Sequence, residues 1–157
     1  MTTPSHDWID DGRGVRQPAL QWSFDAGAAL LGMDLARESG DAVLTGADGQ
    51  LHLLGDDGAP LVPPRAMAGA GHVDWSDAAD GGVVRVGDSR IGWVNRSLKV
   101  EWTLAFHTTV SAIATAPFGN VVAVSLEDQS THIFDTRQQS VAEFTTARPL
   151  RHLHFVS

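Results

Sequence analysis

Apolar and polar positions alternate along this chain in short runs that return after a fixed interval. A step of 40 residues, taken without gaps, aligns four similar stretches: ALLGMDLAR from 29, GAGHVDWSD from 69, TVSAIATAP from 109 and PLRHLHFVS from 149. Self-similarity at a period of about 20–50 residues is the signature of repeat architectures. The pattern therefore predicts one structural unit used three times, with a fourth return at the end of the chain.

Each 40-residue unit is typical of four short β-strands separated by polar turns. In the third unit the strands are expected in TVSAIATAP, VVAVS, STHIFD and SVAEFTT, with Gly, Asp, Asn and Gln between them. Residues of this kind favour tight turns, and no segment carries a helical period of ten or more residues. The fourth strand of the first unit, in APLVPPRAMAGAG, is expected to be an edge strand or a loop because proline cannot donate to a β-ladder.

Residues that share a place in the repeat share their character. Asp48, Asp88 and Asp128 precede the third strand of each unit, where aspartate caps a hairpin turn. Apolar columns fall 40 residues apart in the first and third strands, which predicts the core. The residues that we expect to be buried are Met33, Val73, Ile113, Leu53, Trp93 and Ile133.

The stretches GDAVLTGADGQLHLLGDDG from 40 and GNVVAVSLEDQSTHIFDTRQQ from 119 resemble blades of WD-repeat and quinoprotein-like β-propellers. The resemblance covers about residues 19–157. It implies an all-β fold, a β-propeller of four-stranded antiparallel blades at about 29–68, 69–108 and 109–148. The Trp-Asp dipeptide is replaced by LLGD, WVNR and IFDT, so the resemblance brings no functional residue with it.

The strand inventory predicts an incomplete ring. ALQWSFD at 19–25 fits the register of an outer strand after an irregular segment at 1–18, and 149–157 fits an inner strand of a next blade. Three alternatives follow: an amino-terminal piece of a longer propeller, a half-propeller that pairs, or a small closed four-bladed ring patched by 1–24. In an open form the terminal blades would expose apolar faces, so we expect pairing rather than a lone monomer.

Composition narrows the function classes. With 157 residues the chain has room for one domain with a core, and its net charge of −8 disfavours a nucleic-acid partner. Cysteine is absent, which excludes disulfides and thiolate metal sites. No apolar run reaches the roughly 18 residues of a membrane helix, and no basic-then-apolar leader is present. We therefore expect a cytoplasmic location and no membrane partner.

Five residues of the first strands are candidate metal ligands. Asp34, Asp74 and His154 share one column, and His72 and His152 share the column two residues earlier. By resemblance these strands line a central channel, where imidazole and carboxylate groups would suit a divalent cation. The alternative is that polar side chains simply face a wet channel. We expect no bound cofactor.

The sequence favours a non-catalytic scaffold for protein–protein interaction or assembly. It has no G-x-S-x-G motif and no cysteine nucleophile. The alternative is an enzyme or metal-binding propeller that uses the channel Asp and His residues. Trp8 in the irregular segment, with Leu153 and Phe155 in the last return, are the candidate contacts to a protein partner or a second copy.

Overall fold

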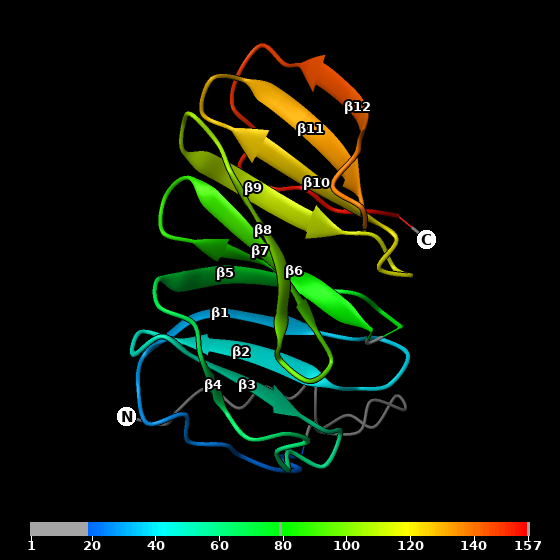
Figure 1. Ribbon diagram of the computed structural model, residues 1–157. Coiled ribbons are helices and arrows are strands. Elements are labelled where there is room, and N and C mark those ends of the chain that lie inside the picture. Colours follow the sequence, from blue (N-terminus) through cyan, green and yellow to red (C-terminus); the bar gives the residue numbers. More distant parts are fainter. Residues whose placement is uncertain (1–18, 79, 157) are drawn as a thin grey trace, which may run out of the picture.

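A computed structural model describes residues 19–78 and 80–156, which fold into three four-stranded antiparallel sheets stacked one upon the next (Figure 1). The strands are β1 (Leu30–Leu35), β2 (Ala42–Gly46), β3 (Gln50–Leu54), β4 (Arg65–Ala66), β5 (Ala70–Trp75), β6 (Gly81–Val86), β7 (Arg90–Asn95), β8 (Val100–Ala105), β9 (Val110–Thr115), β10 (Val121–Leu126), β11 (Ser130–Asp135) and β12 (Ser140–Thr145). Within each sheet the strands follow chain order. Each predicted 40-residue unit therefore folds as one sheet.

The sheets stack in sequence through their first strands. β1 packs on β5, and β5 and β6 pack on β9, so the second sheet lies between the other two. We call the side of a sheet that points toward the preceding sheet its back face, and the opposite side its front face. Side chains alternate between these faces along every strand because successive residues of a strand point to opposite sides.

Two layers of apolar side chains fill the spaces between the sheets. In the first layer, Leu51 and Leu53 of the first sheet pack with Val73 and Trp75 of the second. The buried residues of the second layer are Val83, Ile91, Trp93, Val110, Ile113, Val122, Val124, Leu126 and Phe134. Each layer is shared by two neighbouring sheets, so a single unit cannot bury its apolar residues alone.

Two of the six predicted core residues are not buried. Met33 is 65% exposed, whereas Val73 and Ile113, at the same place in the repeat, are 1% and 3% exposed. Met33 lies on the back face of the first sheet, and no described sheet precedes it. Ile133 is only half-buried because it lies on the front face of the third sheet, which no described sheet follows. The core prediction is wrong only at the two ends of the stack.

The predicted aspartate turns form between the second and third strands of two sheets. Asp48 Oδ1 accepts a hydrogen bond from the backbone N–H of Gln50 at 3.1 Å, and Asp128 Oδ1 accepts one from Ser130 at 3.0 Å. Gly49, in the first of these turns, has φ +77°, a conformation that costs glycine nothing because it has no Cβ. The aspartate turns predicted at Asp48 and Asp128 are therefore confirmed, and each depends only on residues within the turn.

The weak fourth strand of the first unit is short, as its prolines indicate. β4 contains only two residues and pairs with the start of β3. The residues before it, from 61 to 64, form no strand, because Pro63 and Pro64 lack the N–H donors that a ladder needs.

The segment 19–25, predicted as an outer strand, forms no strand in the structure. Instead, Trp22 and Phe24 pack on the back face of the first sheet, and the indole N–H of Trp22 donates to the Asp56 carbonyl at 2.8 Å. The buried residues that they contact are Ala42, Leu44 and Leu54. The aromatic residues thus cover part of an end face rather than extend a sheet.

The last residues, 149–156, also form no strand, and we call them the C-terminal tail. The tail lies against the front face of the third sheet, where Leu153 and Phe155 line a cavity with sheet residues. The stack of described sheets is open and does not close into a small ring. Trp8 and the rest of 1–18 lie outside the described residues.

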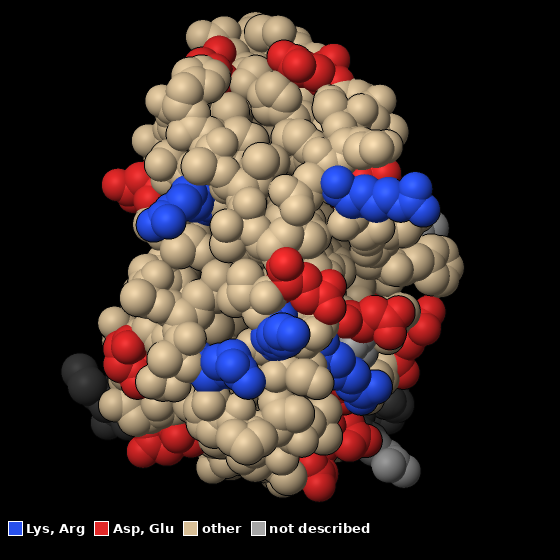
Figure 2. Space-filling view, viewed as in Figure 1, with Lys and Arg blue, Asp and Glu red and all other residues tan. Residues whose placement is uncertain are grey.

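Charged side chains are interspersed over the face drawn in Figure 2, where basic and acidic groups alternate and wide uncharged areas separate them. Over the lower half of that face several basic side chains lie near one another, with acidic groups beside them. Among residues 19–78 and 80–156, no helix is long and apolar enough to cross a membrane.

Candidate functional site

The strands β1, β5 and β9 carry the predicted aspartate column, and its carboxylates join neighbouring sheets. Asp34 Oδ2 accepts a hydrogen bond from the backbone N–H of Trp75 at 2.6 Å. In the same way, Asp74 Oδ1 accepts one from the backbone N–H of Thr115. The third unit has Ala114 at this place, so the series of carboxylate links ends there.

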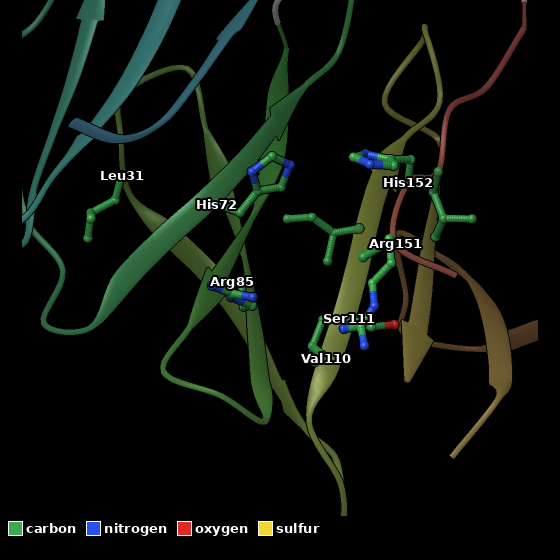
Figure 3. Close-up of a pocket in the computed structure, with 10 residues that line it drawn as sticks. Leu31, His72, Arg85, Val110, Ser111, Arg151 and His152 are labelled. Carbon is green, nitrogen blue, oxygen red and sulfur yellow. The ribbon is translucent and has the colours of Figure 1, made fainter. Parts of the chain in front are cut away.

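A cavity of about 300 Å³ lies between these strands and the C-terminal tail (Figure 3). His72 on β5 and Arg85 on β6 line one side, and Arg151 and His152 on the tail line the other. The remaining lining residues are Leu31, Val110, Ser111, Ala112, Ile113 and Leu153. We call this space the channel-side cavity, because all three sheets contribute to it.

Two lining groups of this cavity were not identified from the sequence. Arg85 Nε and Ser111 Oγ are buried and have no hydrogen-bond partner among the described residues. Arg85 interrupts the apolar run VVRV of β6, and the repeat places Thr45 and Ser125 in the same column. A polar column within an otherwise apolar strand is the signal that could have identified Arg85.

The electrostatic environment of the channel-side cavity is positive. Burial lowers the pKa of His72, and the charge of Arg85 lowers it further, with a smaller contribution from His152. The carboxylate of Asp34 acts in the opposite direction on the pKa of His72, but it does not reverse the shift. His72 is therefore a neutral hydrogen-bonding group at neutral pH.

A smaller cavity of about 40 Å³ holds the other candidate ligands, Asp34, Asp74 and His154. His154 Nε2 lies 3.1 Å from a guanidinium nitrogen of Arg37. Burial raises the pKa of Asp74 to about 7, the hydrogen bond from the Thr115 amide opposes that shift, and the negative charge of Asp34 adds to it.

The five predicted metal ligands do not converge on one point. They divide between the two cavities, and both aspartates are already engaged with backbone amides. In the described part of the chain, no three His, Asp or Glu side chains come together in an arrangement that could hold a metal ion.

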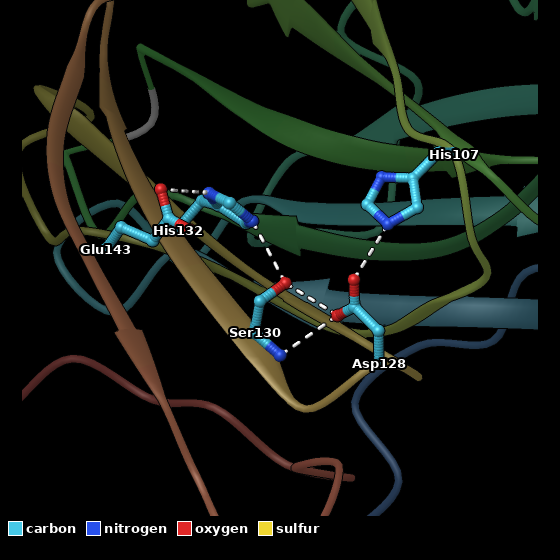
Figure 4. Close-up of polar contacts among 5 residues, drawn as sticks. All are labelled: His107, Asp128, Ser130, His132 and Glu143. Atoms are coloured by element: carbon cyan, nitrogen blue, oxygen red, sulfur yellow. Dashed lines mark hydrogen bonds and ion pairs between the residues drawn. The ribbon is translucent and has the colours of Figure 1, made fainter.

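A line of polar contacts runs from the loop before β9 to the outer strands of the third sheet (Figure 4). His107 Nε2 lies 2.8 Å from Asp128 Oδ2, and Ser130 Oγ donates to Asp128 Oδ1 at 2.6 Å. His132 Nε2 lies 3.0 Å from Ser130 Oγ, and His132 Nδ1 lies 3.6 Å from Glu143 Oε2. The hydrogen bonds from the hydroxyl and amide of Ser130 lower the pKa of Asp128.

Serine, histidine and a carboxylate within contact distance are also the components of a nucleophilic triad. Here the hydroxyl hydrogen of Ser130 is donated to Asp128, so His132 does not receive it. Ser130 does not line the channel-side cavity, the smaller cavity beside Asp34 and Asp74, or the cavities on the two end faces. We interpret these contacts as structural ones that fix the turn before β11.

The back face of the first sheet is apolar and open. Leu30, Met33 and Leu35 are 51%, 65% and 52% exposed. Leu30 and Met33 line a second cavity of about 300 Å³ together with Trp22 and Phe24. Exposed apolar side chains that lie together on one sheet face are typical of an interaction surface.

The front face of the third sheet is hollow rather than raised. Ala114 and Ala123 line a cavity of about 170 Å³. Phe144, on the edge strand β12 of the third sheet, lines it as well. The predicted contact residues Leu153 and Phe155 line the same cavity and are half-buried against their own chain. They form part of this end face instead of projecting from it.

No protein-family model matches the sequence, and no curated protein sequence matches it significantly. The fold, in contrast, is similar to solved structures. U3-55K and the WD40 repeats of RRP9 both give a TM-score of 0.67 at 14% identity, over 83% of this chain and 44% and 43% of theirs. BamB from Moraxella catarrhalis gives 0.68 at 18% identity, over 81% of this chain and 41% of BamB.

The chain folds as part of a β-propeller. Its three sheets are blades, and β1, β5 and β9 are their inner strands, as the resemblance to WD-repeat and quinoprotein-like propellers predicted. The chain spans less than half the length of each of these propeller chains. The propeller is thus incomplete, and both of its end faces belong to blades without a described neighbour.

Proposed function

We propose that this chain is a non-catalytic propeller scaffold that assembles with a protein partner, a second copy of itself, through its two end faces. One observation carries the proposal: Met33 is 65% exposed where Val73 and Ile113, its equivalents in the next two blades, are 1% and 3% exposed. The repeat has kept an apolar residue at a position that only a neighbouring blade buries.

Both end faces are apolar and partly hollow, as expected of blade faces that pack against a neighbouring blade. The back face of the first blade raises Leu30, Met33 and Leu35, and the front face of the third blade is hollow around Ala114 and Ala123. Front-to-back packing is also how the three blades pack within the chain. A second copy can therefore continue the stack in the same sense, with its raised face in the hollow of the first.

Two such contacts, related by a two-fold axis, would close two half-propellers into a ring. Closed symmetry avoids the polymers that repeated front-to-back contacts give when they do not close. Stable interfaces bury about 1,200 Å² or more, which two pairs of blade faces can supply. The contact between the two copies would lack the carboxylate–amide hydrogen bond that joins blades within the chain, because Ala114 stands where Asp34 and Asp74 stand in the other blades. We therefore expect the association to be reversible.

The comparisons support a scaffold by analogy alone, because a propeller fold hosts many functions. Solved propellers similar to this chain include WD40 repeats, but at 14% identity the likeness concerns the fold. The proposal therefore rests on the exposed apolar face, and the experiment addresses that face directly.

Sedimentation equilibrium over a range of protein concentrations tests the proposal. The wild-type chain should give a reversible dimer. Met33→Glu on the raised face and Phe155→Glu at the hollow face should each shift it to monomer, because a charge would be buried without a partner. Phe118→Glu is the matched control: Phe118 is 72% exposed in the turn between β9 and β10 and should leave the dimer intact.

A folded wild-type monomer at every concentration would overturn the proposal. Loss of the dimer in Met33→Glu but not in Phe155→Glu would instead indicate a back-to-back contact and overturn front-to-back closure. Circular dichroism of each variant confirms that the change acts on association and not on folding.

A further inference from the structure

The channel-side cavity has the volume of a small-molecule site. It holds about 300 Å³ between β5, β6, β9 and the C-terminal tail, and ligand pockets begin at about this volume. Figure 3 shows His72 and Arg85 on one side of the space, with Arg151 and His152 across it. Nitrogen-bearing side chains thus approach the space from two separate parts of the chain.

Two buried donors in this cavity lack acceptors. Arg85 Nε and Ser111 Oγ are inaccessible to solvent and unpaired within the described residues. An unsatisfied buried polar group costs about 1–3 kcal/mol, and such groups are rare in native proteins. An acceptor that comes within hydrogen-bond distance of both groups would remove this cost.

The equivalent positions of the previous blade junction are in direct contact. Thr45 shares the repeat column of Arg85, and Gly71 shares that of Ser111. Thr45 Oγ1 donates directly to the carbonyl of Gly71. At the junction between the second and third blades, Arg85 and Ser111 stand in these two positions, and the channel-side cavity lies beside them.

The charged side chains of the cavity favour a negatively charged ligand. Arg85 forms no ion pair with a described carboxylate, whereas Arg151 is paired with Glu127. The chain as a whole is acidic, with a net charge of −8. A guanidinium without a paired carboxylate therefore makes this cavity locally positive. Guanidinium groups bind oxyanions with paired, charge-assisted hydrogen bonds.

We propose that the channel-side cavity binds a small oxyanionic ligand, whose carboxylate, sulfate or phosphate oxygens accept hydrogen bonds from Arg85 Nε and Ser111 Oγ. His72 and His152 line the same space and add donors to the anion. Val110 and Ile113 give the cavity an apolar side that suits a short carbon skeleton. The site lies on β5, β6, β9 and the tail; Leu153 of the tail also lines the cavity of the front end face, whereas Arg85 and Ser111 line neither end face.

Binding is measured by isothermal titration and by the side-chain Nε–H resonance of Arg85 in NMR spectra. The probes are sulfate, inorganic phosphate and succinate, each against chloride at constant ionic strength. Saturable binding that moves the Arg85 resonance is the expected result. A preference for succinate would identify an organic acid, and a preference for phosphate or sulfate would identify an inorganic or ester group.

Arg85→Gln should weaken binding of the preferred probe by at least about tenfold, since it removes a charge-assisted pair. Ser111→Ala should weaken it several-fold and, as a small change, keeps the test valid if the arginine variant does not fold. Arg137→Gln removes the same charge from an exposed turn and should leave affinity unchanged.

Three results would overturn the proposal. One is a probe effect no larger than that of chloride. Another is an equal loss of affinity in Arg137→Gln, which would indicate general charge screening. The third is unchanged affinity in a folded Ser111→Ala together with an unmoved Arg85 resonance.

Discussion

The carboxylate of Asp34 accepts the backbone N–H of Trp75 at 2.6 Å and so ties the first blade to the second. Forty residues on, Asp74 makes the same contact with Thr115, which ties the second blade to the third. Both amides belong to buried residues, 3% and 6% exposed. The aspartate column, which suggests metal ligands when read from the sequence, thus supplies acceptors between blades.

Removal of the Asp34 carboxylate should weaken the junction. Asp34→Ala leaves the Trp75 amide without an acceptor, and we expect it to lower the free energy of unfolding by about 1–3 kcal/mol. Asp34→Asn keeps an oxygen that can accept the same bond and should cost clearly less. Urea denaturation at one protein concentration measures both values, and equal losses would contradict the acceptor role.

Two isoleucines at different depths in the stack should respond differently to the same truncation. Ile113 is 3% exposed between the second and third blades, so Ile113→Ala should cost about 2–5 kcal/mol of unfolding free energy. Ile133 is half-buried on the end face, and Ile133→Ala should cost less than about 2 kcal/mol. Chemical denaturation at low protein concentration compares them. A larger loss for Ile133 would show that this end face is already covered in the free chain.

The sequence predicts the fold well because its main signals are local and repeated. Alternation within each strand and turn residues at 40-residue intervals predict the sheets, and columns such as Leu53 and Trp93 are buried as expected. Exposure of Met33 could not be read from its column, since the pattern is the same whether or not a blade precedes it. The pattern describes a blade, and the neighbours decide what is buried.

The candidate site could be predicted only in part. His72 and His152 share a column of the repeat, and the structure places both on the same cavity. The cavity also depends on the path of the C-terminal tail, which forms no strand although its register predicts one. The unpaired state of Arg85 Nε depends on packing between blades, and no local pattern encodes it.

Added zinc or nickel should not raise the melting temperature of the protein. Asp34 and Asp74 already accept backbone amides, and the Arg37 guanidinium lies 3.1 Å from the Nε2 of His154. A cation would have to displace these contacts to gain ligands. Differential scanning fluorimetry with and without metal provides the measurement. A metal-dependent rise that His152→Ala with His154→Ala abolishes would contradict this expectation and favour a metal-binding propeller.

Asp74 should make stability depend on pH. Burial raises its pKa in the folded protein to about 7, from an ordinary value of 3.8. The folded state therefore binds a proton at Asp74 more tightly than the unfolded chain does. Its stabilising contribution is complete below pH 3.8 and is lost as the pH rises to about 7. His72 titrates in an overlapping range with the opposite sign, so the comparison needs a variant at Asp74 itself.

Asp74→Asn carries no charge and keeps an oxygen that can accept the Thr115 amide. It should match the wild type near pH 3.8 and exceed it in stability by about 1 kcal/mol or more above pH 7. Asp128→Asn is the matched control with the opposite sign, since hydrogen bonds from Ser130 lower the pKa of Asp128. That variant should be less stable than the wild type at neutral pH, with a difference that shrinks in acid. Urea denaturation across this pH range measures both, and a constant offset between Asp74→Asn and the wild type would exclude a raised pKa at Asp74.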